Sequence, residues 1–280
     1  SARLTRAAAL SCKNLVTRLN SQKERPRMKH TTGMTREESQ DLAERVLRHV
    51  SASGWAPDWP PILGLFGSLV VTLTYLRRNS AQVDLAERYG VSQSTISRAI
   101  SSLTAWIAAT LQDDVPTADD LDVNGQYIID GTLLPCWSWA NRPTLWSGKH
   151  STTGVNIQVA CDLSGRLAWI SDPVDGHRHD NAALRASGVL EGMNPQNWFG
   201  DKGYIGLGII TPIRKNPDRD TLEWEHQFNK DVNSIRYHIE RAIAHLKNWR
   251  ILHTDYRRPF PTFTQTISAV IALHFLKQAA

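Results

Sequence analysis

Residues 127–132, with the sequence YIIDGT, place the carboxylate of Asp130 directly after an apolar run, and this feature constrains the fold most strongly. The run contains the aromatic and β-branched residues that favour a buried strand. An isolated carboxylate in such a strand costs several kcal/mol unless another group pairs with it, and a bound cation would offset this cost. We therefore expect a buried strand that carries an acid of a functional site.

A second aspartate follows the same kind of sequence. The apolar pair Trp198-Phe199 leads into Gly200-Asp201, and Gly203 follows two residues later. Glycines at these positions let the backbone or a substrate phosphate come close. The pattern predicts a short strand that ends beside Asp201.

A long helix, predicted from about Asp231 to Arg250, supplies a third acid. Steps of three, four and seven residues place one polar set on a single face, next to an apolar stripe. The polar set is Asn233, Arg236, Glu240 and Lys247, and the stripe is Ile235, Ile239, Ile243 and Leu246. Taken alone, the pattern is more typical of a surface helix with ion pairs. The two aspartates upstream reverse that preference, because a carboxylate flanked by cations suits a site for metal and anionic DNA.

Three carboxylates of this kind suit phosphodiester chemistry. Hydrolysis or transfer can use two divalent ions roughly 4 Å apart, one activating the attacking oxygen and one stabilising the leaving oxygen. Mg²⁺ prefers oxygen ligands and keeps several waters, so a few carboxylates are enough to hold it. We expect Asp130, Asp201 and Glu240 to be catalytic residues and metal ligands, with Mg²⁺ as the ion and Mn²⁺ as a substitute.

The sequence around these acids predicts an α/β fold with a mixed sheet, because three strand patterns are followed by alternating helix and strand patterns. A turn at Ser164–Gly165 joins the second and third strands. The expected elements are strands at 127–137, 150–163 and 165–173, a short helix at 179–187, short strands at 197–206 and 209–216, and helices at 231–250 and 263–276.

Residues 82–111 have the pattern of a helix-turn-helix. A helix near Gln82–Tyr89 is followed by Gly90 and then by a recognition helix near Ser92–Ile107. The core between the two helices is expected to contain Ala86, Val91 and Ile96. Residue types that contact bases and phosphates are expected to face outward, namely Gln93, Ser94, Thr95, Ser97 and Arg98. An ordinary helical hairpin is the alternative.

The remaining patterns suggest the domain boundaries. A helix at 35–50 starts with a capping box of Thr35 and Glu38, and an apolar helix follows at 63–78. The acidic, turn-rich segment 112–125 suits a linker. We expect a basic tail at 1–33, a helical DNA-binding domain at 34–111, this linker, and a catalytic domain at 126–280.

The net charge of +5 is concentrated in the basic tail, where residues 1–30 carry eight Lys or Arg and one acid. Such a tail is typical of proteins that bind phosphates and equally of solvated tails. The chain starts with Ser, so we expect Met28 or Met34 to be the true start, after upstream read-through. The three cysteines fit neither disulfides nor paired metal ligands, and no run approaches the roughly 18 apolar residues of a membrane span. We expect a cytoplasmic protein, associated with the nucleoid when bound to DNA.

Three motifs in this order resemble the insertion-sequence transposases of family five and the related Harbinger-like DDE endonucleases. They are IIDGT at 128–132, GDKGYIG at 200–206 with a following ITP, and the polar set of the long helix. The resemblance covers about residues 35–275, and Asp130, Asp201 and Glu240 match its three acids. Arg236 and Lys247 match its basic, DNA-contacting partners, whereas Asn233 stands where the related signature often has Tyr.

The resemblance implies an RNase-H-like (retroviral-integrase-like) α/β core preceded by an all-α helix-turn-helix domain. It also implies a DNA transposase that uses two Mg²⁺ ions to cut and join double-stranded DNA at terminal inverted repeats. Such a protein acts as a homo-oligomer that brings transposon ends and target DNA together, and it needs no membrane. Two alternatives stay open: an inactive or domesticated relic that only binds DNA, and a cellular RNase-H-like nuclease.

The segment 175–181, DGHRHDN, resembles the stretch before the first core helix in such enzymes. Asp180 either caps the following helix or approaches the active site, and the cap is favoured. His177 and His179 have no partners that would favour zinc. Trp137, Trp139 and Trp146 follow the first acid, where packing in a core or dimer is favoured over stacking on a splayed base.

Overall fold

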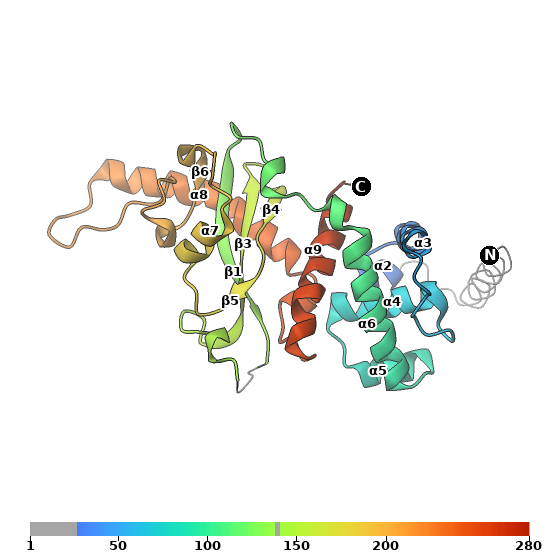
Figure 1. Ribbon diagram of the computed structural model, residues 1–280. Helices are drawn as coiled ribbons and strands as arrows, with labels where there is room; N and C mark the ends of the chain where they lie inside the picture. Colours follow the sequence, from blue (N-terminus) through green and yellow to red (C-terminus); the bar gives the residue numbers. More distant parts are fainter. Residues whose placement is uncertain (1–26, 138–140, 280) are drawn as a thin grey trace. The chain divides into compact units, whose positions relative to one another are not determined.

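The computed structural model describes residues 27–137 and 141–279, and these fall into two compact units (Figure 1). One unit is helical and contains the described residues up to Gln112, with segments 249–251 and 260–273. The other contains the sheet and spans 113–248, 252–259 and 274–280. Within the described residues, no helix combines the length and the apolar character of a membrane span.

The helical unit buries the apolar faces of its helices against one another. Its helices are α2 (Arg27–Thr32), α3 (Arg36–Ser53), α4 (Gly64–Arg78), α5 (Gln82–Tyr89), α6 (Gln93–Thr110) and the first part of α9 (Phe263–Ala279). The expected capping box starts α3, because Thr35 and Glu38 each accept a hydrogen bond from the other's backbone N–H. Segments 249–251 and 260–273, which we expected in the catalytic domain, belong here: Trp249 is buried under the guanidinium of Arg77.

Helices α5 and α6 form the expected helix-turn-helix. Gly90 joins them with a φ of 64°, a left-handed conformation that glycine adopts without strain. Ser92 caps α6 by accepting a hydrogen bond from the Thr95 N–H at 3.2 Å. Ala86 and Ile96 are buried and Val91 is half-buried, so the contact between the helices is largely the expected one.

The second unit has the expected mixed sheet. Its strands are β1 (Tyr127–Pro135), β2 (Trp146–Ser147), β3 (Thr152–Asp162), β4 (Leu167–Ile170), β5 (Val174–Asp175) and β6 (Trp198–Phe199). The whole of β1 pairs antiparallel with residues 154–162 of β3, and β2, β4 and β5 pair antiparallel with β3. β6 pairs parallel with the other side of β1. The strand expected at 209–216 is only a bridge between Ile210 and Phe199, because Pro212 lacks the N–H that a ladder requires.

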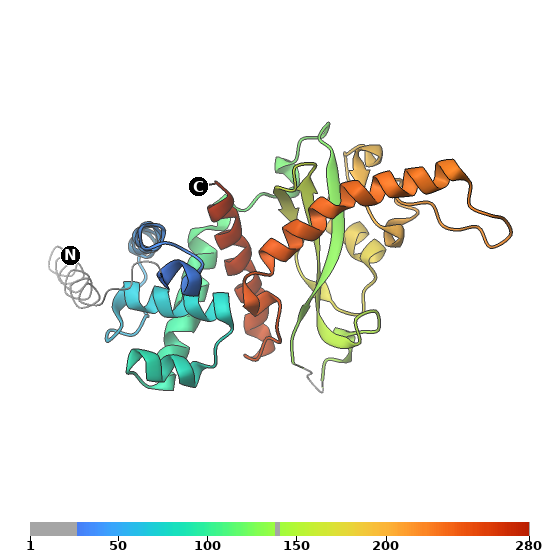
Figure 2. The same ribbon diagram turned by 180° about the vertical axis from the view of Figure 1, so that it is seen from behind.

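Two helices cover opposite faces of this sheet, α7 (Asp180–Ser187) on one side and α8 (Glu223–Leu246) on the other (Figures 1 and 2). α8 starts eight residues before the expected Asp231, because Glu225 accepts a hydrogen bond from the Leu222 N–H and pairs with Arg219 at 2.6 Å. Short 3₁₀ turns complete the described chain: η1 (Gln112–Asp114), η2 (Ala118–Asp120), η3 (Pro143–Leu145), η4 (Pro195–Asn197), η5 (Lys202–Tyr204), η6 (Arg250–Leu252) and η7 (Phe260–Thr262).

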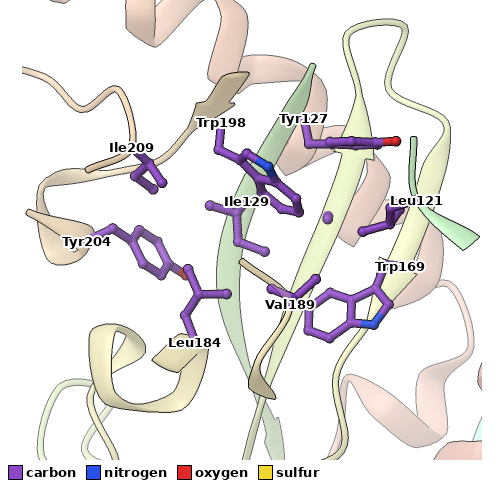
Figure 3. Packing of buried hydrophobic residues seen from close by; sticks show 10 residues of the cluster. Leu121, Tyr127, Ile129, Trp169, Leu184, Val189, Trp198, Tyr204 and Ile209 are labelled. Atoms are coloured by element: carbon purple, nitrogen blue, oxygen red, sulfur yellow. The ribbon is translucent and has the colours of Figure 1, made fainter. Parts of the chain in front are cut away.

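An apolar cluster holds β1 and β6 side by side on the α7 face (Figure 3). Trp198 is fully buried, and its ring centroid lies 4.9 Å from that of Tyr127. Ile129 and Leu184 pack into the same cluster. Burial of large aromatic side chains contributes strongly to stability, so this cluster fixes the strand ends that carry the two aspartates.

Candidate active site

Asp130 and Asp201 lie together because β1 and β6 are parallel neighbours. Tyr127 pairs with Trp198 and Ile128 with Phe199, so continuing this register by two residues places Asp130 beside Asp201. The two carboxylates interact electrostatically, since Asp201 raises the pKa of Asp130. Asp201 is held in place by the Gly203 N–H, which donates to its Oδ1 at 2.7 Å. The structure thus brings the first two predicted acids together.

Burial makes Asp130 an unusual carboxylate. Its side chain is 18% exposed. Burial is the largest influence and raises its pKa to about 6, while Arg236 acts in the opposite direction and Asp201 and Asp180 add to the rise. The Gly131 N–H donates to Oδ1 at 2.9 Å. The fold therefore holds a carboxylate whose charge is only partly compensated.

Helix α8 brings two cations onto β1. The Arg236 Nη2 lies 3.3 Å from the Asp130 Oδ2, and the Lys247 Nζ donates to the Leu133 carbonyl oxygen at 3.0 Å. Burial lowers the pKa of Lys247. Because these cations lie 11 residues apart, they share one helix face, as predicted from the sequence.

Glu240 lies on the same face, one turn after Arg236. Its side chain is exposed, and within the described ranges no hydrogen bond or ion pair involves it. Asn233 is also exposed. The structure therefore places Glu240, the predicted third acid, on the helix that packs against β1, without bringing its carboxylate into contact with the two aspartates.

The resemblance found in the sequence implies a divalent cation at this site, and the chemistry of the donor atoms fits one. Two coupled carboxylates, one of them incompletely compensated, offer the hard oxygen ligands that Mg²⁺ prefers. The described residues contain no ready group of three or more His, Cys, Asp or Glu that could hold a metal. Asp130 Oδ2 instead lies against Arg236. A complete three-acid site therefore requires the Glu240 side chain to turn toward the pair.

Asp180 does not cap α7, contrary to the expectation from the sequence. The N-cap is His179, and Asp180 is the first helical residue. Its Oδ2 accepts a hydrogen bond from the Lys149 Nζ at 2.8 Å, and its Oδ1 accepts one from the Asn156 Nδ2 at 2.9 Å. Burial opposes ionisation of Asp180, but these hydrogen bonds outweigh it and lower its pKa. No local pattern predicts this pairing, because Lys149 lies in a loop 31 residues away.

Gly131 allows Asp180 to approach β1. A Cβ at this position would lie 2.2 Å from the Asp180 Oδ1 and 2.9 Å from the Gln158 Nε2. Gln158 is fully buried, and its Oε1 accepts a hydrogen bond from the Tyr204 hydroxyl at 2.6 Å. The glycine after Asp130 is therefore required by a buried polar network on the α7 face.

The recognition helix presents most of the predicted DNA-contacting residues to solvent. Gln93, Ser94 and Arg98 are exposed and Ser97 is half-buried. Thr95 is an exception, because it is 6% exposed and its hydroxyl hydrogen-bonds the Ser92 hydroxyl at 2.9 Å. The expectation that Thr95 faces outward is wrong: its side chain lies inward and joins the helix cap.

The other residues noted in the sequence do not join the carboxylates. His177 Nδ1 lies 2.9 Å from the Thr144 carbonyl oxygen. Trp137 and Trp146 are about half exposed, so the core packing favoured for them is not observed. Trp139, Cys12 and the basic tail before Arg27 lie outside the described residues.

Comparison with known proteins identifies the family of both units. Residues 129–274 match the family model of the DDE superfamily endonucleases, and residues 62–112 match the helix-turn-helix of DDE superfamily endonucleases. No solved structure gives a significant match.

Two relatives extend over most of the chain. The putative transposase for insertion sequence element IS112 of Streptomyces albus G is 30% identical over 209 residues, which cover 74% of this chain and 78% of the relative. The probable transposase for insertion sequence element IS702 of Microchaete diplosiphon is 21% identical over 215 residues, covering 72% and 76%. The chain therefore belongs to the DDE superfamily of transposases and carries both its endonuclease domain and its helix-turn-helix.

Proposed function

We propose that this protein cuts double-stranded DNA at the terminal inverted repeats of its own element and joins the cut ends to target DNA. One observation carries the proposal: Asp130 and Asp201 meet at neighbouring parallel strands, opposite a helix that carries Glu240. The match to DDE endonucleases and the two relatives named as transposases support the same function.

The fold that we propose for the catalytic domain is RNase-H-like. Three antiparallel strands run in the order β4-β3-β1, and β6 adds to β1 as a parallel fourth strand. The segment at Ile210 then bridges to β6 in parallel. This order, with α8 across one face, supports the assignment.

Asp130, Asp201 and Glu240 are the residues that would hold Mg²⁺, or Mn²⁺ in its place, with two ions in the complete site. When bound, these ions would activate the attacking oxygen and stabilise the leaving oxygen of a phosphodiester. Arg236 compensates part of the charge of Asp130 while no metal ion is bound. Glu240 is one helical turn from Arg236 and would be the third ligand of a metal ion held beside Asp130.

In the first step, water attacks a phosphorus atom, the bond from phosphorus to the 3′ oxygen breaks, and that oxygen takes up a proton. In the second step, the oxygen of the freed 3′ hydroxyl loses its proton and bonds to a phosphorus atom of the target, the bond from that phosphorus to the target 3′ oxygen breaks, and the displaced oxygen takes up a proton. Gln93, Ser94, Ser97 and Arg98 of the recognition helix would contact the repeats, and Arg236 and Lys247 the DNA at the site. Thr95 is buried and is left out of this set. A homo-oligomer in the cytoplasm, bound to the nucleoid through DNA, would hold both ends.

The test is a cleavage assay on a plasmid that carries the DNA flanking the gene for this protein, in Mg²⁺ or Mn²⁺, with breaks mapped at nucleotide resolution. We expect metal-dependent breaks at matched inverted repeats, and none with Asp130→Asn. Binding at the repeats without breaks in either metal would favour a relic that only binds DNA. Scattered breaks unrelated to the repeats would favour a general nuclease.

A further inference from the structure

Lys149 is more accessible than Arg236 and Lys247, the two cations that α8 brings to the site. Arg236 is bonded to Asp130 and Lys247 to the Leu133 carbonyl, and both side chains are largely enclosed. The Lys149 side chain, in contrast, is 57% exposed while its ammonium group is fixed at 2.8 Å from Asp180. A cation that is both anchored and accessible is placed to receive an anion.

The carboxylates around Lys149 are those of the candidate active site. Its charged form is opposed by burial but favoured first by Asp180, then by Asp201 and Asp130, and the net result is a raised pKa. Lys149 therefore stays protonated and lies within electrostatic reach of both predicted catalytic aspartates. β6 pairs with β1 only at Tyr127 and Ile128, so this pairing ends two residues before Asp130.

The buried carboxylate of Asp180 holds two other side chains in place, those of Lys149 and Asn156. It is 8% exposed, and each of its oxygens accepts a hydrogen bond, Oδ2 from Lys149 and Oδ1 from Asn156. Hydrogen bonds to a buried carboxylate hold its partners in one geometry. The loop that carries Lys149 is thereby attached to α7 and, through Asn156, to β3.

We propose that Lys149 binds a backbone phosphate of DNA close to the bond that is cut, and that Asp180 is the positioning residue that holds Lys149 there. This inference rests on the proposed function of the site, since it names a substrate contact for the same reaction. Lys149 supplies a charge-assisted hydrogen bond to a non-bridging phosphate oxygen, as lysine does in other phosphate sites.

The test uses the full-length protein and duplexes of the repeat end in which each phosphate near the mapped cut is replaced in turn by a neutral methylphosphonate. Affinity is measured in EDTA and again in Ca²⁺, and is expressed at each position as the ratio of the dissociation constant for the neutral duplex to that for the natural one. For the unaltered protein we expect a ratio of about ten at one or two positions, the loss typical of a charged hydrogen bond. Lys149→Met should reduce the ratio to near one at those positions only, whereas Lys230→Met, at an exposed lysine of α8, should leave it unchanged.

Asp180→Asn separates positioning from simple repulsion. If Asp180 holds Lys149, the ratio falls at the same positions, because the lysine loses its anchor. If Asp180 only repels the phosphate, removal of its charge strengthens binding of the natural duplex and the ratio rises, which overturns the positioning role. Circular dichroism and thermal unfolding check that each variant is folded, and Lys149→Met is expected to fold because the side chain is mostly exposed.

Two further results overturn the proposal itself. One is a flat profile of ratios for the unaltered protein in both EDTA and Ca²⁺, and the other is an unchanged profile in Lys149→Met. Failure of the proposed function is distinguishable, because the unaltered protein would then make no breaks at the repeats in Mg²⁺ or Mn²⁺.

Discussion

The helical unit and the α/β unit treat polar side chains in opposite ways. In the helical unit the buried polar groups are small and neutral, such as Ser68 and Thr72, and the residues expected to contact DNA are exposed on α6. In the α/β unit Asp130, Asp180 and Lys247 are drawn into the interior beside the sheet. Recognition needs only exposed groups on a stable scaffold, whereas the chemistry proposed here needs charges held in fixed positions at some loss of stability.

This difference implies that cutting and binding can be separated by one substitution. Asp130→Asn should reduce cleavage and joining to background, because it removes the charge of the first acid while preserving its shape. Affinity for the repeats should change less than about twofold, because the helix-turn-helix is untouched. Parallel cleavage and gel-shift assays on the same preparation measure both. Loss of binding together with cleavage would contradict a division of labour between the units.

Stability should be affected more by a single methyl group beside the site than by most surface changes. Gly131→Ala places a Cβ 2.2 Å from the Asp180 Oδ1, so we expect a loss of about 1–3 kcal/mol in the free energy of unfolding of the α/β unit. Urea denaturation measures it. Gly148→Ala is the matched control, because its Cβ would meet no atom within 4 Å and should leave the free energy nearly unchanged. Equal stability of the two variants would mean that the polar network does not pack as described.

Substitutions on the exposed face of α6 should change the affinity for DNA without changing the stability of the helical unit. Arg98→Ala should weaken binding to the repeats by about tenfold and leave thermal unfolding unchanged, because the side chain is exposed. Arg88→Ala removes the same charge from an exposed position on α5 and serves as the control. A similar weakening in both variants would point to nonspecific attraction instead of a contact by α6.

Titration of the interior should follow the charges that surround Asp130. In the metal-free protein, ¹³C NMR of this carboxyl should show a midpoint near pH 6, lower in Asp201→Asn and higher in Arg236→Gln. Because the folded-state pKa lies above the ordinary value of 3.8, protonation of Asp130 contributes stability at low pH, and that contribution is lost as the pH rises through about 6. A midpoint near 4 that neither variant shifts would show that the carboxyl is not enclosed as described.

Local patterns were sufficient to predict most elements of both units. The capping box at Thr35, the glycine turn at Gly90 and the apolar run before Asp130 each act over a few residues, so their outcome is encoded locally. The metal-ligand role expected for Asp130 and Asp201 predicts that the two acids meet, but the parallel pairing of β1 with β6 that brings them together is seen only in the structure.

The predictions from sequence are wrong where contacts with distant residues, or competing local contacts, determine the structure. α8 starts early because Glu225 in its first turn accepts a hydrogen bond from the Leu222 N–H and pairs with Arg219 before the helix, a cap that the spacing of apolar residues does not reveal. Thr95 turns inward because its hydroxyl bonds with Ser92. The local pattern predicts Asp180 as a helix cap. This prediction is wrong because Lys149 and Asn156 reach Asp180 from other parts of the fold, which the sequence does not show.

Joining of a pre-cut end tests the proposed function without depending on the first cut. A labelled duplex of the repeat end with a free 3′ hydroxyl would be incubated with the protein, Mg²⁺ and a supercoiled target plasmid. We predict labelled 3′ ends covalently joined to the plasmid, and none with Asp130→Asn. Hydrolysis of the plasmid with no joined product would contradict a transposase and identify the site as that of a nuclease.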